Sequence, residues 1–458
     1  MDSIRIDGKS LQTLAGELRE AHNVVGLTLG VLKDGVIETA GAGLLNKATG
    51  VECTADSAFQ IGSITKIFTT TLIMQLVEAG RLSLDDPVIK HLPDFALADL
   101  AAARAVTVRQ LLNHTSGIEG DFFPADDPEG PSVGGYVRKM CLLPSLYPPG
   151  QGPVSYCNSG FVLAGRLIEV LTGLTWQSAV MERICKPLGM PVAFAHPHEA
   201  LRFRAAMGHM PDPKDDKSMI AAPITYLPIS MAPAGSVLMM SAESLLLFAK
   251  AHLNDGAYGN GQRLLSAESA RAMREPATKL PAFSPLMSHI GLGWFVADRP
   301  GYRMVAHTGG TIGQSTLLAA YPEHKVAYAL FVNSPSGKLF EEADKLLLKS
   351  LPGHEVPAPL ARESFTPKLE RYLGHYSAIM FDCHIALKDD KLTFKLKGKS
   401  PLVQDQEATL EPFSPDVFEM KNDKLPPDGP KALFVGDDAE GRAQFICLGS
   451  RLARRVVV

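Results

Sequence analysis

The stretch Ser63-Ile64-Thr65-Lys66 places a hydroxyl and an amine three residues apart at the start of a strongly helical segment. Residues i and i+3 lie on the same face of a helix. Ser63 and Lys66 can therefore meet as a nucleophile and its proton acceptor, the arrangement of serine–lysine acyl transfer. The run that follows is apolar on most faces and ends at Gly80, which predicts a buried helix.

Two downstream motifs strengthen this interpretation. The S-x-x-K spacing alone is weak, since it occurs about once or twice by chance in a chain of this length and also suits a capping serine with a solvated lysine. Tyr156-Cys157-Asn158 follows a proline- and glycine-rich turn and precedes a helical pattern, so a phenol and an amide can point into one cleft. His307-Thr308-Gly309-Gly310 predicts a strand edge that another backbone approaches closely.

In this order the three motifs resemble the serine β-lactamase and penicillin-recognising superfamily, specifically its class C-like branch. That branch includes class C β-lactamases, D,D-carboxypeptidases, D-aminopeptidases, family VIII esterases and penicillin-binding-protein-type thioesterases or peptide cyclases. The resemblance covers roughly residues 10 to 345, and further segments that look like the family are 59–62, 80–87, 111–117, 233–236 and 291–294. It implies an acyl-enzyme on Ser63.

The resemblance also implies a role for each motif residue. Ser63 is the expected nucleophile, and the general base is either Lys66 or Tyr156. Lys66 can accept a proton only if its pKa falls well below the free value of about 10.4. Asn158 is expected to hold the Lys66 ammonium or the substrate amide. The backbone N–H groups of Ser63 and Gly310 are expected to bind the oxyanion.

His307 departs from class C β-lactamases, which generally have a lysine at this position. A histidine is mostly neutral at pH 7 and lacks the fixed charge that orients a carboxylate. Since esterases and D-aminopeptidases of the branch often carry histidine there, we expect ester, D-amino-acid amide or peptidyl (thio)ester substrates, with His307 supplying a hydrogen bond near Tyr156. The alternatives are a true class C-like β-lactamase or D,D-carboxypeptidase and, from another class, a β-lactam receptor that is acylated without turnover.

Three other matches are interpreted as structural. Tyr258-Gly259-Asn260 repeats the Y-x-N pattern inside a turn. His114 follows a helical pattern and is expected to be a helix-end or packing residue. The segment 130–134 has the G-x-S-x-G form of a nucleophile elbow but lacks the preceding strand that the elbow needs. Its Ser132 is the next candidate nucleophile if Ser63 is not the reactive serine.

Composition excludes several classes of protein. The formal net charge of −4, without blocks of like charge, argues against a nucleic-acid partner. The six cysteines lack C-x-x-C spacing and are expected to be reduced, mostly packed thiols, and neither a metal nor a cofactor is expected. The N-terminus lacks a secretory signal, and no apolar run is long enough to span a membrane. If residue 1 is the natural start, we expect a cytoplasmic protein with a small-molecule or peptide acyl substrate; a homodimer is an open possibility.

The order of expected strands predicts an α/β (α+β) fold. A hairpin at 25–41 and late strands around His307, at 316–321 and at 326–332 predict one antiparallel sheet closed by both chain ends and flanked by helices and an all-helical half, over residues 1–351. A proline-rich linker is expected at 352–364. Short strands and turns in 365–458 predict a small antiparallel β-barrel. It resembles the lipocalin-like domain of some relatives, and its role is open between walling the substrate cleft and stability or dimerisation.

Overall fold

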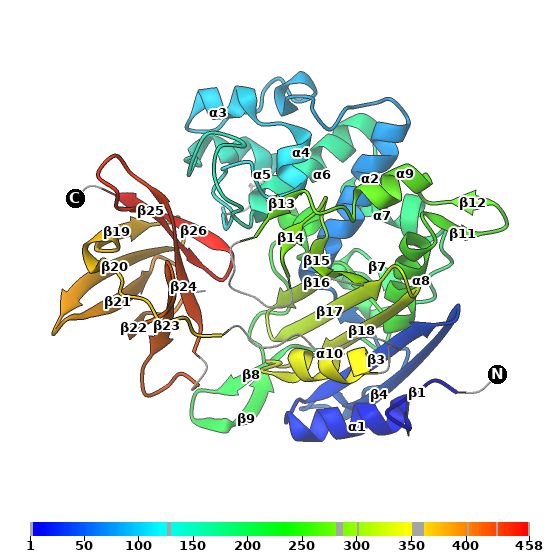
Figure 1. The fold of residues 1–458 in the computed structure, drawn as a ribbon. Helices are drawn as coiled ribbons and strands as arrows, with labels where there is room; N and C mark the ends of the chain where they lie inside the picture. The colour runs from blue at the N-terminus through cyan, green and yellow to red at the C-terminus, as the bar shows by residue number, and fades with distance from the viewer. Residues whose placement is uncertain are drawn as a thin grey trace.

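The computed structural model describes residues 3–125, 130–280, 287–299, 302–349, 361–400, 403–426 and 429–456. A large antiparallel sheet with helices around it makes up most of the molecule, and a closed β-barrel from the C-terminal part of the chain lies beside it (Figure 1). The mixed α/β fold with a C-terminal barrel is therefore confirmed. The predicted linker 352–364 lies mostly outside the described residues.

The large sheet joins early and late strands of residues 1–351, as predicted. β3 (Gly26–Lys33) forms a hairpin with β4 (Val36–Asn46) and pairs on its other side with β18 (Val326–Val332). Within the described residues the strand order is β13-β14-β15-β16-β17-β18-β3-β4-β5. The remaining strands of this sheet are β5 (Val51–Glu52), β13 (Thr278–Lys279), β14 (His289–Ile290), β15 (Phe295–Arg299), β16 (Tyr302–Thr311) and β17 (Gln314–Tyr321).

Both faces of the sheet are buried against helices. Leu27, Leu29 and Val31 of β3 pack in one apolar core with α1 (Leu11–Ala21) and α10 (Leu339–Lys349). Leu32 points the other way, into a larger core that includes α2 (Thr65–Glu78) and α8 (Ala242–Leu253). Successive side chains of a strand alternate between faces, so a strand covered on both sides reads as a continuous apolar run.

The helical half packs around α2, which is buried on nearly all faces as its sequence predicts. The helix α6 (Asn158–Thr172) and the 3₁₀ helix η6 (Ile229–Ala234) lie against it. The other α-helices are α3 (Leu100–Ala105), α4 (Val108–Leu112), α5 (Val133–Lys139), α7 (Trp176–Val180) and α9 (Ala267–Ala272). The short strands outside the large sheet and the barrel are β1 (Arg5–Ile6), β2 (Lys9–Ser10), β6 (Phe59–Gln60), β7 (Ala193–Phe194), β8 (His209–Asp212), β9 (Asp215–Ala221), β10 (Met239–Met240), β11 (Ala257–Gly259) and β12 (Gln262–Arg263).

The C-terminal barrel closes because its last strand pairs with its first. Buried aromatic side chains, among them Tyr376, Phe394, Phe418 and Phe434, fill its interior. Closure leaves no unpaired strand edge within a barrel. Its strands are β19 (Gly374–Ser377), β20 (Phe381–Lys388), β21 (Lys391–Gly398), β22 (Gln406–Ser414), β23 (Val417–Lys421), β24 (Lys431–Asp437), β25 (Ala443–Leu448) and β26 (Arg451–Val456).

The barrel docks on the helical half through an apolar cluster. Leu146 and Tyr147 pack with Val417, Leu433 and Phe445 of the barrel. The rings of Tyr147 and Phe445 meet edge to face at a centroid distance of 6.0 Å. This contact holds the barrel against the segment that precedes α6 and carries Tyr156.

Candidate active site

The hydroxyl and the amine of the first motif meet at the start of α2. The Lys66 Nζ atom lies 3.1 Å from Ser63 Oγ and 2.6 Å from the carbonyl oxygen of Ala234. Lys66 is fully buried, so the alternative of a solvated lysine is wrong. Burial, assisted by the positive charge of Arg451, lowers the pKa of Lys66 well below its ordinary value. An amine with such a pKa can be neutral near pH 7 and accept a proton.

The backbone of β16 approaches the turn that carries Ser63, as the glycine pair predicts. Gly62 has a left-handed φ of 52°, and a Cβ there would lie 2.6 Å from the Gly310 nitrogen. A Cβ on Gly309 would lie 2.0 Å from the Ile61 oxygen. β15 pairs with β16 only as far as Ala306, so the described part of β15 leaves 307–311 as an edge on that side. The Gly310 nitrogen therefore lies against the turn that carries Ser63.

Tyr156 is buried away from solvent among three basic side chains. Its ring stacks on the His114 imidazole at a centroid distance of 4.4 Å. Lys66 Nζ lies 4.8 Å and Arg451 Cζ 5.0 Å from the ring centroid. Burial raises the pKa of the Tyr156 phenol, and a hydrogen bond with Ser63 partly opposes this rise. The phenol is therefore protonated at neutral pH and in contact with the serine hydroxyl.

Asn158 begins α6 and contacts a residue that the motifs did not indicate. Its Nδ2 donates a hydrogen bond to Asp121 Oδ1 at 2.6 Å, and no bond to Lys66 occurs among the described residues. Asp121 also forms an ion pair with Arg451, the first residue of β26 in the barrel. Arg451 lies almost four hundred positions after Ser63, so no local spacing could have linked the two.

His114 does more than the packing role expected from its place after α4. Its side chain is 1% exposed, and its backbone has a left-handed φ of 59°. In this conformation its carbonyl accepts the Ser155 N–H at 3.1 Å and its Nδ1 accepts the Cys157 N–H at 2.9 Å. The Tyr156 N–H donates to the Ser450 carbonyl of the barrel at 2.8 Å. Three consecutive peptide groups around Tyr156 are thus held in place.

His307 lies on β16 beside the same site. A carbonyl oxygen only accepts, so the 2.6 Å contact with the Thr308 oxygen places the imidazole proton on Nδ1 and the lone pair on Nε2. Within the described residues Nε2 has no hydrogen-bond partner, and the ring lies 6.2 Å from that of Tyr156. Burial and the nearby Lys66 lower the pKa of His307 to about 3, so the imidazole is neutral.

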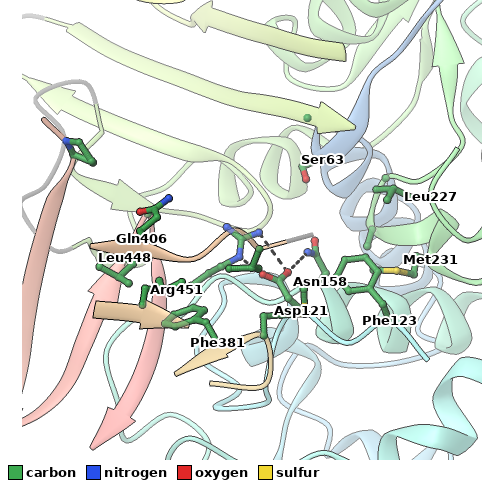
Figure 2. Close-up of a pocket in the computed structure, with 18 of the residues that line it drawn as sticks. Ser63, Asp121, Phe123, Asn158, Leu227, Met231, Phe381, Gln406, Leu448 and Arg451 are labelled. Atoms are coloured by element: carbon green, nitrogen blue, oxygen red, sulfur yellow. Dashed lines mark hydrogen bonds and ion pairs between the residues drawn. The ribbon is translucent and has the colours of Figure 1, made fainter. Parts of the chain in front are cut away.

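Ser63 opens into a cavity of about 530 Å³ (Figure 2). Asp121, Asn158 and Arg451 form a hydrogen-bonded row along one side of it. Apolar groups flank this row on both sides: Phe123, Leu227 and Met231 belong to the part before the barrel, and Phe381 and Leu448 belong to the barrel. The cavity therefore combines a nucleophile, the Asp121–Arg451 ion pair, a further lysine, Lys431, and extensive apolar walls.

The other sequence matches have structural explanations. Ser132 caps α5, where its Oγ accepts the Gly135 N–H at 3.0 Å. Tyr258 and Asn260 lie in the β11–β12 hairpin, as expected of a turn. All six cysteines are free, and all but Cys141 are buried. In the part of the chain that is described, no cluster of metal-ligating side chains occurs, and no helix is long and apolar enough to cross a membrane.

Comparison with known proteins agrees with this geometry. Residues 11–351 match the family model described as Beta-lactamase. The chain therefore belongs to the beta-lactamase family, within the superfamily of serine hydrolases that also contains penicillin-binding proteins. The motif-based resemblance is thus confirmed at the level of the family.

Individual relatives extend the comparison. Penicillin-binding protein 4 of Amycolatopsis lactamdurans is 39% identical over 356 residues, which cover 77% of this chain and 91% of that protein. The crystal structure of SurE matches with a TM-score of 0.80 and 28% identity, covering 97% of this chain and 98% of SurE. A D-stereospecific amidohydrolase from Streptomyces sp. matches with a TM-score of 0.57 and 27% identity, covering 72% of this chain and 97% of that one.

Replacing His114 should impair catalysis through Tyr156. His114→Ala leaves the buried Cys157 N–H without an acceptor, and displacement of a catalytic group by about 1 Å can cost roughly 100-fold in rate. We expect kcat for a p-nitrophenyl ester to fall at least about ten-fold with little change in KM. His114→Asn should restore most of kcat, since asparagine tolerates left-handed φ and its Oδ1 can replace Nδ1.

The matched control is His252→Asn, which alters another buried histidine that does not line the cavity. It should lower the melting temperature without lowering kcat of the folded protein. Full activity in His114→Ala, or equal losses in His114→Ala and His114→Asn, would contradict the assignment of His114 as a positioning residue.

Proposed function

We propose that the protein is a serine hydrolase or acyltransferase that forms an acyl-enzyme on Ser63 with ester, D-amino-acid amide or peptidyl (thio)ester substrates. The observation that carries this proposal is the buried Lys66 amine, 3.1 Å from Ser63 Oγ at the wall of a cavity. The similarity to a D-stereospecific amidohydrolase, and to SurE, of which a second structure contains D-Leu, supports substrates of D configuration.

The proposed acylation starts with attack of Ser63 Oγ on the substrate carbonyl carbon. The serine proton passes to the neutral Lys66 amine, while the N–H groups of Ser63 and Gly310 bind the oxyanion. When the tetrahedral intermediate collapses, Tyr156 gives its phenolic proton to the leaving alcohol, amine or thiol. Transfer of the stored proton from Lys66 to Tyr156 restores both side chains.

Deacylation is proposed to repeat these steps with a second nucleophile. Water or an amine attacks the acyl carbonyl and loses its proton to Lys66. The bond to Ser63 breaks, and Tyr156 returns a proton to the serine oxygen. The reaction is a hydrolysis when water is the acceptor and a transfer when an amine is the acceptor. The partly apolar cavity favours the amine, because an amine can bind to the cavity walls and water cannot.

The charges of the site support neutral acyl groups. Arg451 is the permanent cation beside Tyr156, and Asp121 compensates it. His307 is neutral, so it does not add the fixed charge that a lysine adds in class C β-lactamases. These features favour esters, amides and thioesters over β-lactams that carry a carboxylate.

A second candidate function is reaction with penicillins, as a D,D-carboxypeptidase or β-lactamase. The relative that is 39% identical is named a penicillin-binding protein. Arg451 retains guanidinium donors beyond those directed at Asp121, and these can bind a carboxylate. A panel of p-nitrophenyl butyrate, a D-alanyl anilide, a peptidyl thioester and nitrocefin separates the candidates by their kcat/KM values.

We further propose that residues 1–351 form the catalytic domain and residues 365–458 a barrel domain that completes the site. The barrel supplies Arg451 to the cavity and the Ser450 carbonyl to the Tyr156 loop. These contacts favour a role in the active site over a role in stability or dimerisation alone.

Ser63→Ala should abolish covalent labelling by fluorophosphonate and penicillin probes, because Ser63 is the serine beside the buried amine. Intact-protein mass spectrometry of probe-treated protein measures the adduct. Ser132→Ala is the matched control and should label like the wild type. An undiminished adduct on Ser63→Ala would move the nucleophile elsewhere.

The losses caused by Lys66→Ala and Tyr156→Phe should not multiply. If both side chains serve one proton-transfer network around Ser63, the double variant is little worse than the worse single variant, as with other residues that act as a unit. The measurement is kcat/KM for p-nitrophenyl butyrate in all four proteins. Strictly multiplicative losses would assign the two residues to independent steps.

His307→Lys should raise nitrocefin hydrolysis relative to hydrolysis of p-nitrophenyl butyrate, since an ammonium attracts a β-lactam carboxylate and a neutral imidazole does not. The quantity compared is the ratio of the two kcat/KM values in each protein. Wild-type turnover of nitrocefin near the diffusional ceiling of roughly 10⁸ M⁻¹s⁻¹ would instead identify a true β-lactamase.

A further inference from the structure

One end of the C-terminal barrel opens towards Ser63. Leu396 pairs with Gln406 and Leu448 with Arg451, and Gln406, Leu448 and Arg451 lie at the ends of their strands. Leu396 and Leu448 pack on the apolar core inside the barrel, so these positions face inward. All four residues line the cavity that contains Ser63. The mouth of the barrel and the candidate active site thus share one space (Figure 2).

The barrel part of this cavity is a mostly apolar recess, whose polar lining residues are Gln406, Lys431 and Arg451. We define the barrel recess by Phe381, Phe394, Leu396, Met420 and Leu448, which all line the cavity. Phe394 is 1% exposed and belongs to the barrel core, so it closes the inner end. Phe381 begins β20 and pairs with Gly398, the last residue of β21, so it lies at the mouth, and Met420 lies next to the end of β23. Leu396 and Leu448 are only half-buried and lie nearer the mouth.

Such a recess is suited to a ligand rather than to folding alone. Half-buried leucines that face a cavity leave apolar surface in contact with water, and covering that surface is favourable. The cavity volume of about 530 Å³ lies within the range of about 300 to 1,000 Å³ that is usual for small-molecule sites. The mouth of a β-barrel is also a frequent position for such sites.

We propose that the barrel recess binds the apolar chain of the acyl donor while the reacting carbonyl lies at Ser63. The assignment rests on the proposed acyl-enzyme. The acyl group remains attached to Ser63 through both half-reactions, whereas the leaving group must escape to solvent. A recess that is closed at its inner end suits the part that is retained. The preferred substrates are then long-chain acyl esters or peptidyl groups with apolar side chains, in preference to acetyl or other short acyl groups.

The test is the acyl chain-length profile of p-nitrophenyl acetate, butyrate, hexanoate and octanoate. Wild-type kcat/KM should rise about four-fold per methylene that enters the recess, the equivalent of roughly 0.8 kcal/mol. Leu448→Asn and Leu396→Trp should flatten the profile from butyrate onwards, so that the ratio of kcat/KM for octanoate to kcat/KM for acetate falls towards one. Leu387→Asn is the matched control, since Leu387 is an exposed barrel residue that does not line the cavity.

Acetate hydrolysis and fluorophosphonate labelling of Ser63 keep this inference separate from the proposed function. If wild-type Ser63 is neither labelled nor acylated by acetate, the acyl-enzyme itself is wrong. If Ser63 reacts but the wild-type profile is flat, or the profile survives in Leu448→Asn and Leu396→Trp, the recess assignment is wrong. Butyrate thioesters with alkyl thiols of increasing length form a second series. If kcat/KM depends on the length of the thiol and not on the length of the acyl chain, the assignment is also wrong.

Discussion

The burial of the Lys66 amine beside Ser63 is the constraint on which the rest of the site depends. Burying an ammonium group away from water costs free energy unless a group of opposite charge pairs with it. Its hydrogen-bond partners among the described residues are a hydroxyl and a carbonyl, not a carboxylate. The amine is therefore shifted towards its neutral form. Any change that lets water reach the amine raises its pKa again. The close approach of β16 at Gly62 and the all-round burial of α2 both keep it dry.

The loop that carries Tyr156 depends on two distant parts of the chain. His114 supplies two acceptors from the helical half, and Ser450 supplies one from the barrel. Ser155 adds a further link, since its Oγ accepts the Leu452 N–H at 3.3 Å. Of these contacts, the two made by Ser450 and Leu452 form only after the barrel has docked. This arrangement couples the folding of the C-terminal part to the geometry around Ser63.

Local patterns in the sequence predicted the parts of the site whose geometry is local. Ser63 and Lys66 meet because i and i+3 share a helix face, and the paired glycines of β16 indicate a close backbone approach. Alternation and turn signals likewise predicted the large antiparallel sheet and the barrel. Asp121 and Arg451 were missed because their meeting depends on how the barrel docks, which no spacing encodes. His114 was interpreted as a packing residue because its left-handed backbone, which directs both acceptors at one loop, is a property of the folded chain.

The electrostatics and the shape of the cavity point to the same kind of ligand for independent reasons. The Arg451–Asp121 pair contributes no net charge, and both His307 and Lys66 have pKa values lowered by burial. The groups nearest to Ser63 therefore carry little net charge, whereas Lys431 adds a cation on the barrel side of the cavity. Filling the apolar recess, in turn, is favourable only for groups that leave water readily. Asp121 connects the two properties, because without it Arg451 would add an uncompensated charge at the mouth of the recess and lower the pKa of Lys66 further.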